Sequence, residues 1–440
     1  MNRRNAKRPP RLAFEARSPR PQRRAFLALF AVMGTSVQCG GTESAAFSPV
    51  TGSRFAVIRT DFSATSIAIL DENADILAPA IISSGLQAPG LVAPLSGDVV
   101  LADAPRGSAG ILNIVDRLGT DVITRYDIEA GALLGQLRVA PGNFSTNPQD
   151  MAVVDASRAW VSRFSVNLDP TAGAADRAND LIEIEPTTFR QTGRRVSFMP
   201  LTTTATATRD GGPVPVDAFA RPSLLTVVGR TIVVGLSFLS FEFDAAGPGR
   251  IALVDADTGQ MTPFTLPATN RNCGSVRLAP DASDTVFVAC SGFSRPFGDE
   301  VRVRATSGVY RLRIDDGEPQ LLDAWRPRED AGRPVAVQNV VPLSSQRFFG
   351  VRFGELDARG DEAFIVDLLT GEATLVFRST DAFSIGLPAF DAATGLLVVP
   401  DSSARVLRRY RLQPSGDFID EGTIAFSDGP LPPYQAYLVP

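Results

Sequence analysis

A short phrase recurs seven times along this chain: an apolar run, usually an acidic residue, and a tight turn that closes near a glycine. The copies lie around Asp71, Asp127, Glu185, Asp255, Asp315 and Asp367, and the last ends at Gly416. Successive copies are roughly 46–70 residues apart, a spacing typical of four-stranded propeller blades. The repeat therefore predicts an all-β, seven-bladed β-propeller of antiparallel blades, in which each copy forms the third strand and the turn to the fourth.

Most copies follow a second pair of apolar runs, which we expect to be the first two strands of the same blade. Six such hairpins occur, over residues 90–104, 150–164, 223–237, 275–289, 337–353 and 387–401. The first copy has only residues 55–60 before it, and residues 434–439 have no strands after them. The C-terminal segment is therefore predicted to form the innermost strand of blade 1 and to close the ring. The apolar run at 111–117 is either the second strand of blade 2 or an insertion.

Composition excludes several kinds of chemistry. The chain has no His, and Lys7 is its only Lys. Without imidazole or a lysine amine, Ser-His-Asp hydrolysis, His-ligated zinc and Schiff-base catalysis are excluded for residues 39–440. These residues carry a net charge of −13, within −5 for the whole chain, so nucleic acid and anionic lipid surfaces are unfavourable partners.

The N-terminus has the pattern of an export signal. Residues 1–38 combine nine basic residues with an apolar run at 25–37 that is too short to span a bilayer. Arg23 and Arg24 fit a twin-arginine signal, and the general secretory route is the alternative. Cys39 follows the apolar run, as in a lipoprotein signal, where this Cys becomes the lipidated first residue. The alternative is an ordinary signal that is cleaved near Cys39 without lipidation. Residues 39–53 are then a flexible tether and 54–440 the propeller.

Two further cysteines frame one of the inner hairpins. Cys273 and Cys290 lie on either side of a turn at 280–283. In an antiparallel hairpin such residues face each other closely enough for a disulfide, and an oxidising compartment outside the cytoplasm would preserve it. We predict a Cys273–Cys290 disulfide, with two buried free thiols as the alternative.

Long connections are the main indication of function. The longest are residues 164–180, 201–220, 292–307, 326–334 and 353–361. All join a second strand to a third or one blade to the next, and these two loop classes emerge on the same propeller face. Insertions gathered on one face are typical of a binding face, although neutral loop growth is the alternative. Thr202–Thr208 is predicted to be a flexible loop.

One group of polar residues lies on or beside these loops. The candidate ligand-face residues are Asn147, Asp150, Arg163, Asn167, Asp169 and Asp180. Asn147, Asp150, Asp169 and Asp180 offer the oxygen ligands that Ca²⁺ prefers, but their spacing is not that of an EF-hand, and loop-stabilising Asx turns explain them equally. Arg163 either points into the central channel or pairs with a neighbouring Asp. Trp160 and Trp325 are predicted to be packing residues.

The segments LNIVDR, TRYD, NPQD, AWVSRF and NDLIEIEP occur between residues 112 and 186 in that order. This order resembles secreted bacterial seven-bladed propellers, which are similar in fold to lactonase-like and quinoprotein-like propellers and are common among surface lipoproteins. The resemblance extends over about residues 54–440 and implies a propeller located outside the cytoplasm. Lactonase-like enzymes surround a metal with carboxylate, Asn and often His ligands, and the last of these is missing here.

We therefore expect a lipid-anchored, extracytoplasmic and monomeric propeller. Its predicted function is non-catalytic binding of a protein or small molecule through the long-loop face. The alternative is a calcium-assisted hydrolase of the lactonase-like class. Convergence of several carboxylates near the channel would favour the enzyme, and an exposed apolar patch would favour the binding module.

Overall fold

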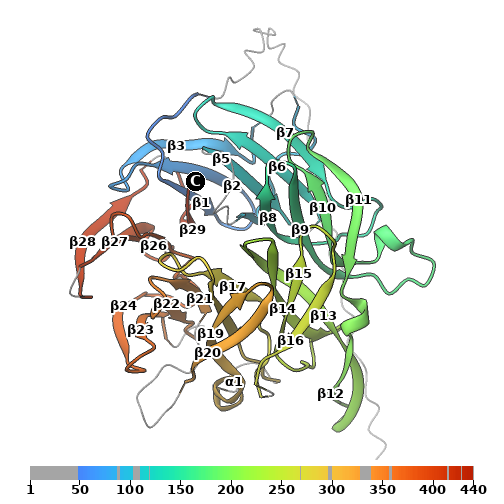
Figure 1. Cartoon of the computed structure of the whole chain (residues 1–440). Coiled ribbons are helices and arrows are strands. Elements are labelled where there is room, and N and C mark those ends of the chain that lie inside the picture. Colours follow the sequence, from blue (N-terminus) through green and yellow to red (C-terminus); the bar gives the residue numbers. More distant parts are fainter. Residues whose placement is uncertain are drawn as a thin grey trace, which may run out of the picture. The chain divides into compact units, whose positions relative to one another are not determined.

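The computed structural model describes residues 48–86, 90–102, 110–117, 119–267, 269–295, 300–327, 338–355, 359–413, 416–427 and 429–439. The predicted signal, Cys39 and the first part of the tether lie outside these ranges. Seven antiparallel sheets follow one another around a ring in Figure 1. This arrangement confirms the seven-bladed propeller.

Each sheet is one blade, with strands ordered from the channel outward. Blade 1 is β29 (Pro433–Leu438), β1 (Phe55–Thr60), β2 (Thr65–Leu70) and β3 (Ile76–Ser83). Blade 2 is β4 (Val99–Leu101), β5 (Ile111–Asp116), β6 (Val122–Asp127) and β7 (Ala132–Arg138). Blade 3 is β8 (Pro148–Asp155), β9 (Arg158–Val166), β10 (Ala178–Glu185) and β11 (Arg190–Ser197).

Blade 4 is β13 (Gly212–Val228), β14 (Thr231–Ser240), β15 (Arg250–Asp255) and β16 (Met261–Thr265), and a fifth strand, β12 (Thr203–Arg209), pairs with residues 212–218 of β13 beyond the end of β14. Blade 5 is β17 (Ser275–Leu278), β18 (Thr285–Ser291), β19 (Ser307–Asp315) and β20 (Glu318–Trp325). Blade 6 is β21 (Gln338–Pro342), β22 (Arg347–Arg352), β23 (Glu362–Asp367) and β24 (Ala373–Arg378). Blade 7 is β25 (Ala389–Asp391), β26 (Leu396–Asp401), β27 (Val406–Leu412) and β28 (Phe418–Ala425).

Ring closure follows the prediction. The C-terminal strand β29 pairs antiparallel with β1, with Leu438 opposite Phe55 and Gln435 opposite Ile58. The last residues of the chain thus form the innermost strand of the first blade. Closure in this way protects an edge of the first sheet that would otherwise stay open.

Alternation along the strands explains why the blades pack. In β1, Phe55 and Val57 join the apolar cluster shared with blade 7, whereas Ala56 and Ile58 join the cluster shared with blade 2. Seven such clusters lie between neighbouring blades, one at each contact. Because successive side chains point to opposite faces, a strand with apolar residues at every position is stable only between two neighbours. The fully buried Trp160 and Trp325 belong to these clusters, as predicted.

The repeated acidic residue has a local role. The Oδ1 atom of Asp71 accepts hydrogen bonds from the amides of Asn73 and Asp75, each at 2.8 Å. Asp255 accepts in the same way from the amides of Asp257 and Thr258, at 3.0 and 2.7 Å. Each carboxylate thereby satisfies turn amides between the third and fourth strands, as in an Asx turn. At these two positions the acid therefore stabilises the turn.

Two sequence predictions about the strands are wrong. In blade 2 the proposed hairpin over 90–104 contributes only β4, and the run at 111–117 is the second strand β5, which pairs with both β4 and β6. The connection between β4 and β5 is therefore long, unlike the other inner turns. Thr202–Thr208 is not a flexible loop, because Thr203 onward forms β12 and pairs with β13 along its whole length.

The described parts of the other long connections contain few regular elements. They contain the short turns η1 (Ala174–Asp176) and η2 (Met199–Leu201) and the helix α1 (Glu300–Thr306). No helix among the described residues is long and apolar enough to cross a membrane.

Candidate functional site

A polar cavity lies in the central channel, at the end of the propeller where the innermost strands begin. Its volume is about 280 Å³, and every blade contributes to its wall. The polar residues of the wall are Arg117, Gln149, Asp150, Ser223, Ser237, Asn272, Ser275, Arg277, Ser291, Gln338, Asn339, Gln435 and Tyr437. The long connections between second and third strands, and between blades, emerge at this same end. The cavity is therefore open toward the long-loop face.

Asp150 is the only one of the six predicted ligand-face residues that lines the cavity. It is 2 % exposed and lies near the start of β8. Its carboxylate accepts hydrogen bonds from the amides of Met151 and Leu225, each at 2.8 Å. The second bond crosses to β13, where the ladder with β14 is interrupted between Pro222 and Leu225. Asp150 therefore both joins blades 3 and 4 and places negative charge in the cavity wall.

Asn147 acts one step behind the wall. Its side-chain oxygen accepts a 2.7 Å hydrogen bond from the side chain of Gln149, which lines the cavity. The backbone N–H of Asn147 donates a 2.8 Å hydrogen bond to the carboxylate of Asp121. Gln149 in turn accepts a 3.3 Å bond from Arg117, whose guanidinium also pairs with Asp98. Asn147 adopts a left-handed backbone with φ of 50°, which Asn tolerates better than most residues. This chain of contacts orients the amide and the guanidinium at the mouth of the cavity.

Arg163 and Asp180 pair with each other and do not reach the cavity. The guanidinium donates two hydrogen bonds to the carboxylate, at 2.7 and 2.6 Å, and two more to the carbonyls of Val139 and Ala175. Burial raises the pKa of Asp180, and the neighbouring guanidinium groups of Arg163 and Arg195 oppose that rise. The pair fastens β9 to β10 beside the loop that follows β9, which is the structural alternative considered for Arg163.

Asn167 and Asp169 stabilise that loop. Asn167 donates to the carbonyl of Asp176 at 3.1 Å, and Asp169 accepts from the amide and hydroxyl of Thr171 at 2.8 and 2.6 Å. These bonds to Thr171 lower the pKa of the exposed Asp169. The four proposed calcium ligands thus lie in separate surroundings. Among the described residues, no group of three or more His, Cys, Asp or Glu is placed to hold a metal ion.

The buried phenol of Tyr437 and the buried carboxylate of Asp150 interact in the cavity wall. Burial raises the pKa of the Tyr437 phenol, and the carboxylate of Asp150 adds to the rise, whereas Arg277 and Arg117 oppose it. The Tyr437 hydroxyl donates a 2.8 Å hydrogen bond to Gln435 on the same strand. The phenol therefore stays neutral at ordinary pH. The wall then presents hydroxyls and amides, two guanidinium groups and one carboxylate.

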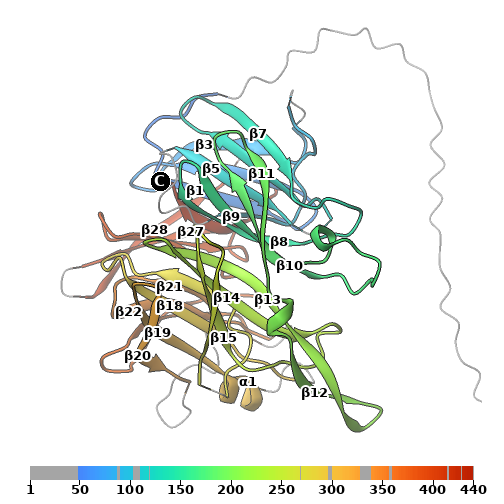
Figure 2. The ribbon, with the colours of Figure 1, turned by 45° about the vertical axis from the view of Figure 1, so that its right-hand side comes forward.

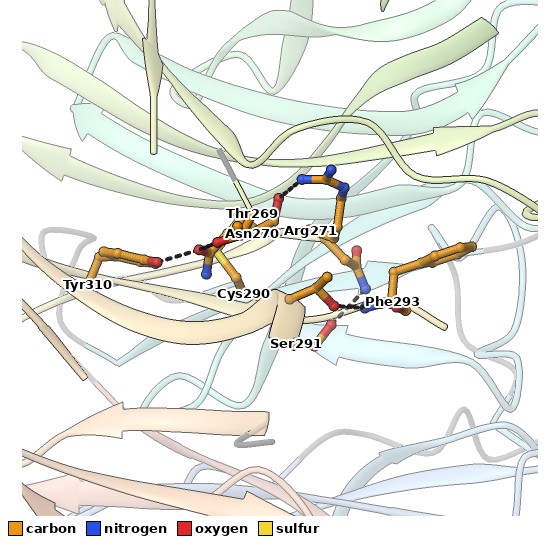
Figure 3. Close-up of a disulfide and its surroundings, with 10 residues drawn as sticks. Thr269, Asn270, Arg271, Cys290, Ser291, Phe293 and Tyr310 are labelled. Atoms are coloured by element: carbon orange, nitrogen blue, oxygen red, sulfur yellow. Dashed lines mark hydrogen bonds between the residues drawn. A yellow bond between two sulfur atoms is a disulfide. The ribbon is translucent and has the colours of Figure 1, made fainter. Parts of the chain in front are cut away.

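The predicted disulfide is present and supports the cavity wall. Cys273 precedes β17 and Cys290 lies in β18, and both are fully buried. Ser275 lies opposite Ala289, so the two cysteines are one position out of register and the bond is slightly diagonal. Figure 3 shows Asn270 beside the bond, accepting from Tyr310, and the Asn272 amide donates to Ser291 at 2.7 Å. The disulfide thereby holds the segment that contributes Asn272, Gly274 and Ser275 to the cavity.

Most of the wall was missed in the sequence. Three of the missed residues, Gln149, Gln338 and Gln435, lie at or near the start of an innermost strand. The fourth, Arg117, directly follows the second strand β5. The boundaries of the inner hairpins in the sequence predict these positions, because the starts of the innermost strands meet at one end of the channel. Asn167 and Asp169, by contrast, belong to an oxygen-rich loop, which is a local pattern that the sequence shows.

Comparison with known proteins supports the fold alone. No protein-family model matches the chain, and no curated protein matches it. A proposed 6-phosphogluconolactonase from Bacteroides fragilis superposes with a TM-score of 0.53 and 10% identity, over 89% of this chain and 99% of that one. A second, from Bacteroides uniformis, gives 0.54 and 11%, over 88% and 100%. A hypothetical selenium-binding protein from Sulfolobus tokodaii gives 0.56 and 13%, over 89% and 94%.

These likenesses place the chain among seven-bladed β-propellers with lactonase-like structural neighbours. At such low identity they carry no site residue from one protein to the other.

Proposed function

We propose that this propeller binds a small, hydroxyl-rich polar molecule in the central cavity, at the long-loop face, without transforming it. The observation that supports this is the wall itself, to which six of the seven blades bring polar groups, while blade 7 contributes the apolar Leu387. Ligand sites combine a concave surface with a few convergent polar groups that fix orientation. A volume of about 280 Å³ is near the lower end for such sites and fits a ligand of monosaccharide size better than a peptide.

The charges in the wall support a ligand with little net charge. Arg117 is already paired with Asp98, and Asp150 lies in the wall that also holds Arg277. A polyol, a sugar or a sugar lactone would use the hydroxyls and amides as alternating donors and acceptors. Each such bond contributes about 0.5–1.5 kcal/mol, so several are needed for useful affinity.

Calorimetry with sugars, sugar acids, lactones and polyols tests the proposal. Gln338→Leu removes one wall amide and should weaken binding about tenfold, which corresponds to one lost hydrogen bond. Gln320→Leu is the matched control, because Gln320 is exposed on the outermost strand of blade 5 and should leave affinity unchanged. Absence of binding by every compound class, or equal effects of the two variants, would overturn the proposal.

A calcium-assisted hydrolase remains a second candidate. The cavity places one buried carboxylate, Asp150, in the same wall as Arg117 and Arg277. In this reading Asp150 is the proton acceptor, and the two guanidinium groups polarise the carbonyl of the substrate. The structural neighbours described as proposed 6-phosphogluconolactonases favour lactones as the first substrates to test. Turnover of a lactone, with or without Ca²⁺, that disappears in a folded Asp150→Asn protein would favour the enzyme. Calcium that only raises the melting temperature would not.

We also propose that the mature protein is lipid-anchored through Cys39 outside the cytoplasm. The basic segment, the apolar run and the Cys-Gly-Gly sequence support this, and a disulfide suits an oxidising compartment. Cys39→Ser should release the protein from the membrane fraction, whereas Cys273→Ser should leave it there. An unmodified mature N-terminus elsewhere in the chain would contradict the anchor.

A further inference from the structure

A two-stranded hairpin extends blade 4 beyond the four-strand plan. It consists of β12 and the first part of β13, with Arg209 opposite Gly212 and Thr203 opposite Ala218. Figures 1 and 2 show β12 projecting from the edge of the blade. Arg209 donates to Asp244 at 2.7 Å, and Ala207 is almost fully buried, so one face of the hairpin is held against the loop after β14. The hairpin is therefore an oriented element.

The turn determines which backbone groups point outward. Asp210 and Gly211 both have positive φ, 49° and 79°, as in the two-residue hairpin turn that favours Asp-Gly. In such a hairpin the residues that flank the turn form a hydrogen-bonded pair, and pairs then alternate along the ladder. The N–H and C=O groups of Thr204, Thr206 and Thr208 consequently point away from β13. On β13, the positions that point away from β12 include 213 and 215.

The two edges of the hairpin differ in their capacity to pair. Positions 213 and 215 are both proline, which has no N–H to donate, and β14 ends at Ser240, opposite Ala218, before it reaches them. Proline at outward positions is a common protection of a sheet edge. The β12 edge has no such protection: residues 203–208 contain neither proline nor charge, and β12 is the terminal strand of its sheet.

The unprotected edge is self-complementary. If two copies of β12 run antiparallel about Thr206, each Thr206 faces the other, Thr204 faces Thr208, and Ala205 faces Ala207. Cross-strand Thr–Thr pairs are favourable, and no like charges become opposed. The only charge in β12, Arg209, is already paired with Asp244 and would lie opposite Thr203. An unrelated charged or bulky strand would not match this edge as well.

In place of the monomer expected from the sequence, we propose that β12 is a docking edge for a second copy of this chain, joined by antiparallel β12–β12 pairing across a two-fold axis. Such an isologous contact closes on itself and stops at two subunits, because the other edge is blocked by Pro213 and Pro215. About six intermolecular backbone hydrogen bonds form. The contact is smaller than a standard protein interface, so the dimer is weak, with a dissociation constant on the order of 10–100 μM. Tethering on one membrane would raise the effective concentration.

Sedimentation analysis of the purified full chain in mild detergent tests the proposal over a concentration series around that range. The wild type should shift from monomer to dimer. Thr206→Pro should remain monomeric, because it removes an outward N–H that β13 does not use. Thr206→Lys should also remain monomeric, since two lysines would face each other across the axis. Thr206→Ser keeps the backbone donors and should dimerise like the wild type.

The hairpin must stay folded for these variants to be informative. Unchanged circular dichroism and melting temperature establish this. If Thr206→Pro disturbs the strand, Thr206→Lys still tests the proposal, because it keeps the backbone N–H. Restoring donors at the other edge with the double change Pro213→Thr and Pro215→Thr should produce species larger than dimers. A wild type that is monomeric throughout, or dimers that persist in both Thr206→Pro and Thr206→Lys, would overturn the proposal.

Discussion

The two ends of this propeller are built in different ways. At the turn end, the connections between third and fourth strands are short, and Asp71, Asp127, Asp255 and Asp367 each accept amide hydrogen bonds within their own turn. At the loop end, Asp150 and Asp180 accept hydrogen bonds from outside their own turn. Asp150, for example, accepts from the amide of Leu225 in the next blade.

The ion pairs at the two ends differ in how far they are exposed to water. At the turn end, Arg230 pairs with Asp155 and Asp257 in an exposed network that lowers the pKa of both carboxyls. At the loop end, Arg163 and Asp180 form a pair that is almost completely buried. Exposed pairs contribute little because water and salt screen them, whereas a buried charge depends on its partner. We therefore expect a substitution in the Arg163–Asp180 pair to cost more than one in the Arg230 network.

Deletion of residues 433–440 should have the largest effect, because it removes a strand that serves both ends. β29 closes the ring through β1 and contributes Gln435 and Tyr437 to the cavity. We expect loss of cooperative folding or a fall in melting temperature of tens of degrees, measured by calorimetry. Melting like that of the intact chain would show that closure is dispensable.

The two kinds of ion pair provide the sharpest comparison of the ends. Asp180→Ala leaves Arg163 buried without its carboxylate and should cost about 3–5 kcal/mol of unfolding free energy. Asp257→Ala removes exposed contacts to Arg158 and Arg230 and should cost much less than Asp180→Ala, with a dependence on salt. Urea denaturation measures both. Equal costs would remove the distinction drawn between the two ends.

Loss of the disulfide should have an intermediate effect. Replacing both Cys273 and Cys290 by Ser opens a loop with a sequence separation of 17 residues, and the chain-entropy estimate for such a loop is about 3 kcal/mol. Because the bond holds Asn272 and Ser275 in place, ligand affinity should fall as well. Reduction of the wild type by dithiothreitol should reproduce both effects, and stability unchanged by reduction would contradict the estimate.

Tyr437→Phe should have the smallest effect at neutral pH and a distinct one in alkali. Burial raises the native pKa of Tyr437, while the unfolded value is about 10. The stability that comes from burying the neutral phenol is therefore complete below about pH 10 and is lost as the pH rises above that value. The variant should cost about 1 kcal/mol or less at pH 7, for the lost bond to Gln435, and should lose less stability than the wild type above pH 10. Parallel pH profiles for the two proteins would show that Tyr437 does not titrate as inferred.

Part of the site was predictable from sequence, and part was not. Asp150 was identified because it precedes an apolar hairpin in an oxygen-rich stretch, and the pairing of Arg163 with a nearby Asp was one of two stated alternatives. Gln338 and Gln435 were overlooked because each is an isolated amide without a local pattern. They belong together only because seven strand starts meet at one end of the channel.

Blade 2 and the β12 hairpin show the same limit for the fold. Residues 90–98 and 99–104 looked like two strands about a turn, but β5 occupies the place beside β4. The Thr-rich run at 203–208 looked like a loop, yet Asp210-Gly211 is a hairpin turn of the kind that sequence can reveal. Strand pairing is decided by the neighbour that becomes available, and short apolar or Thr-rich segments do not specify it locally.

The sequence alone determined the seven blades, ring closure, the buried tryptophans and the disulfide. Each follows from a local rule repeated along the chain: two-residue alternation, turn chemistry and the spacing of cysteines about a turn. Only the tertiary structure decided which polar side chains share the cavity, that Arg163 and Asp180 are buried together, and that one edge of blade 4 is open. These outcomes depend on contacts between blades, where residues far apart in the chain compete for the same partners and no short pattern records the result.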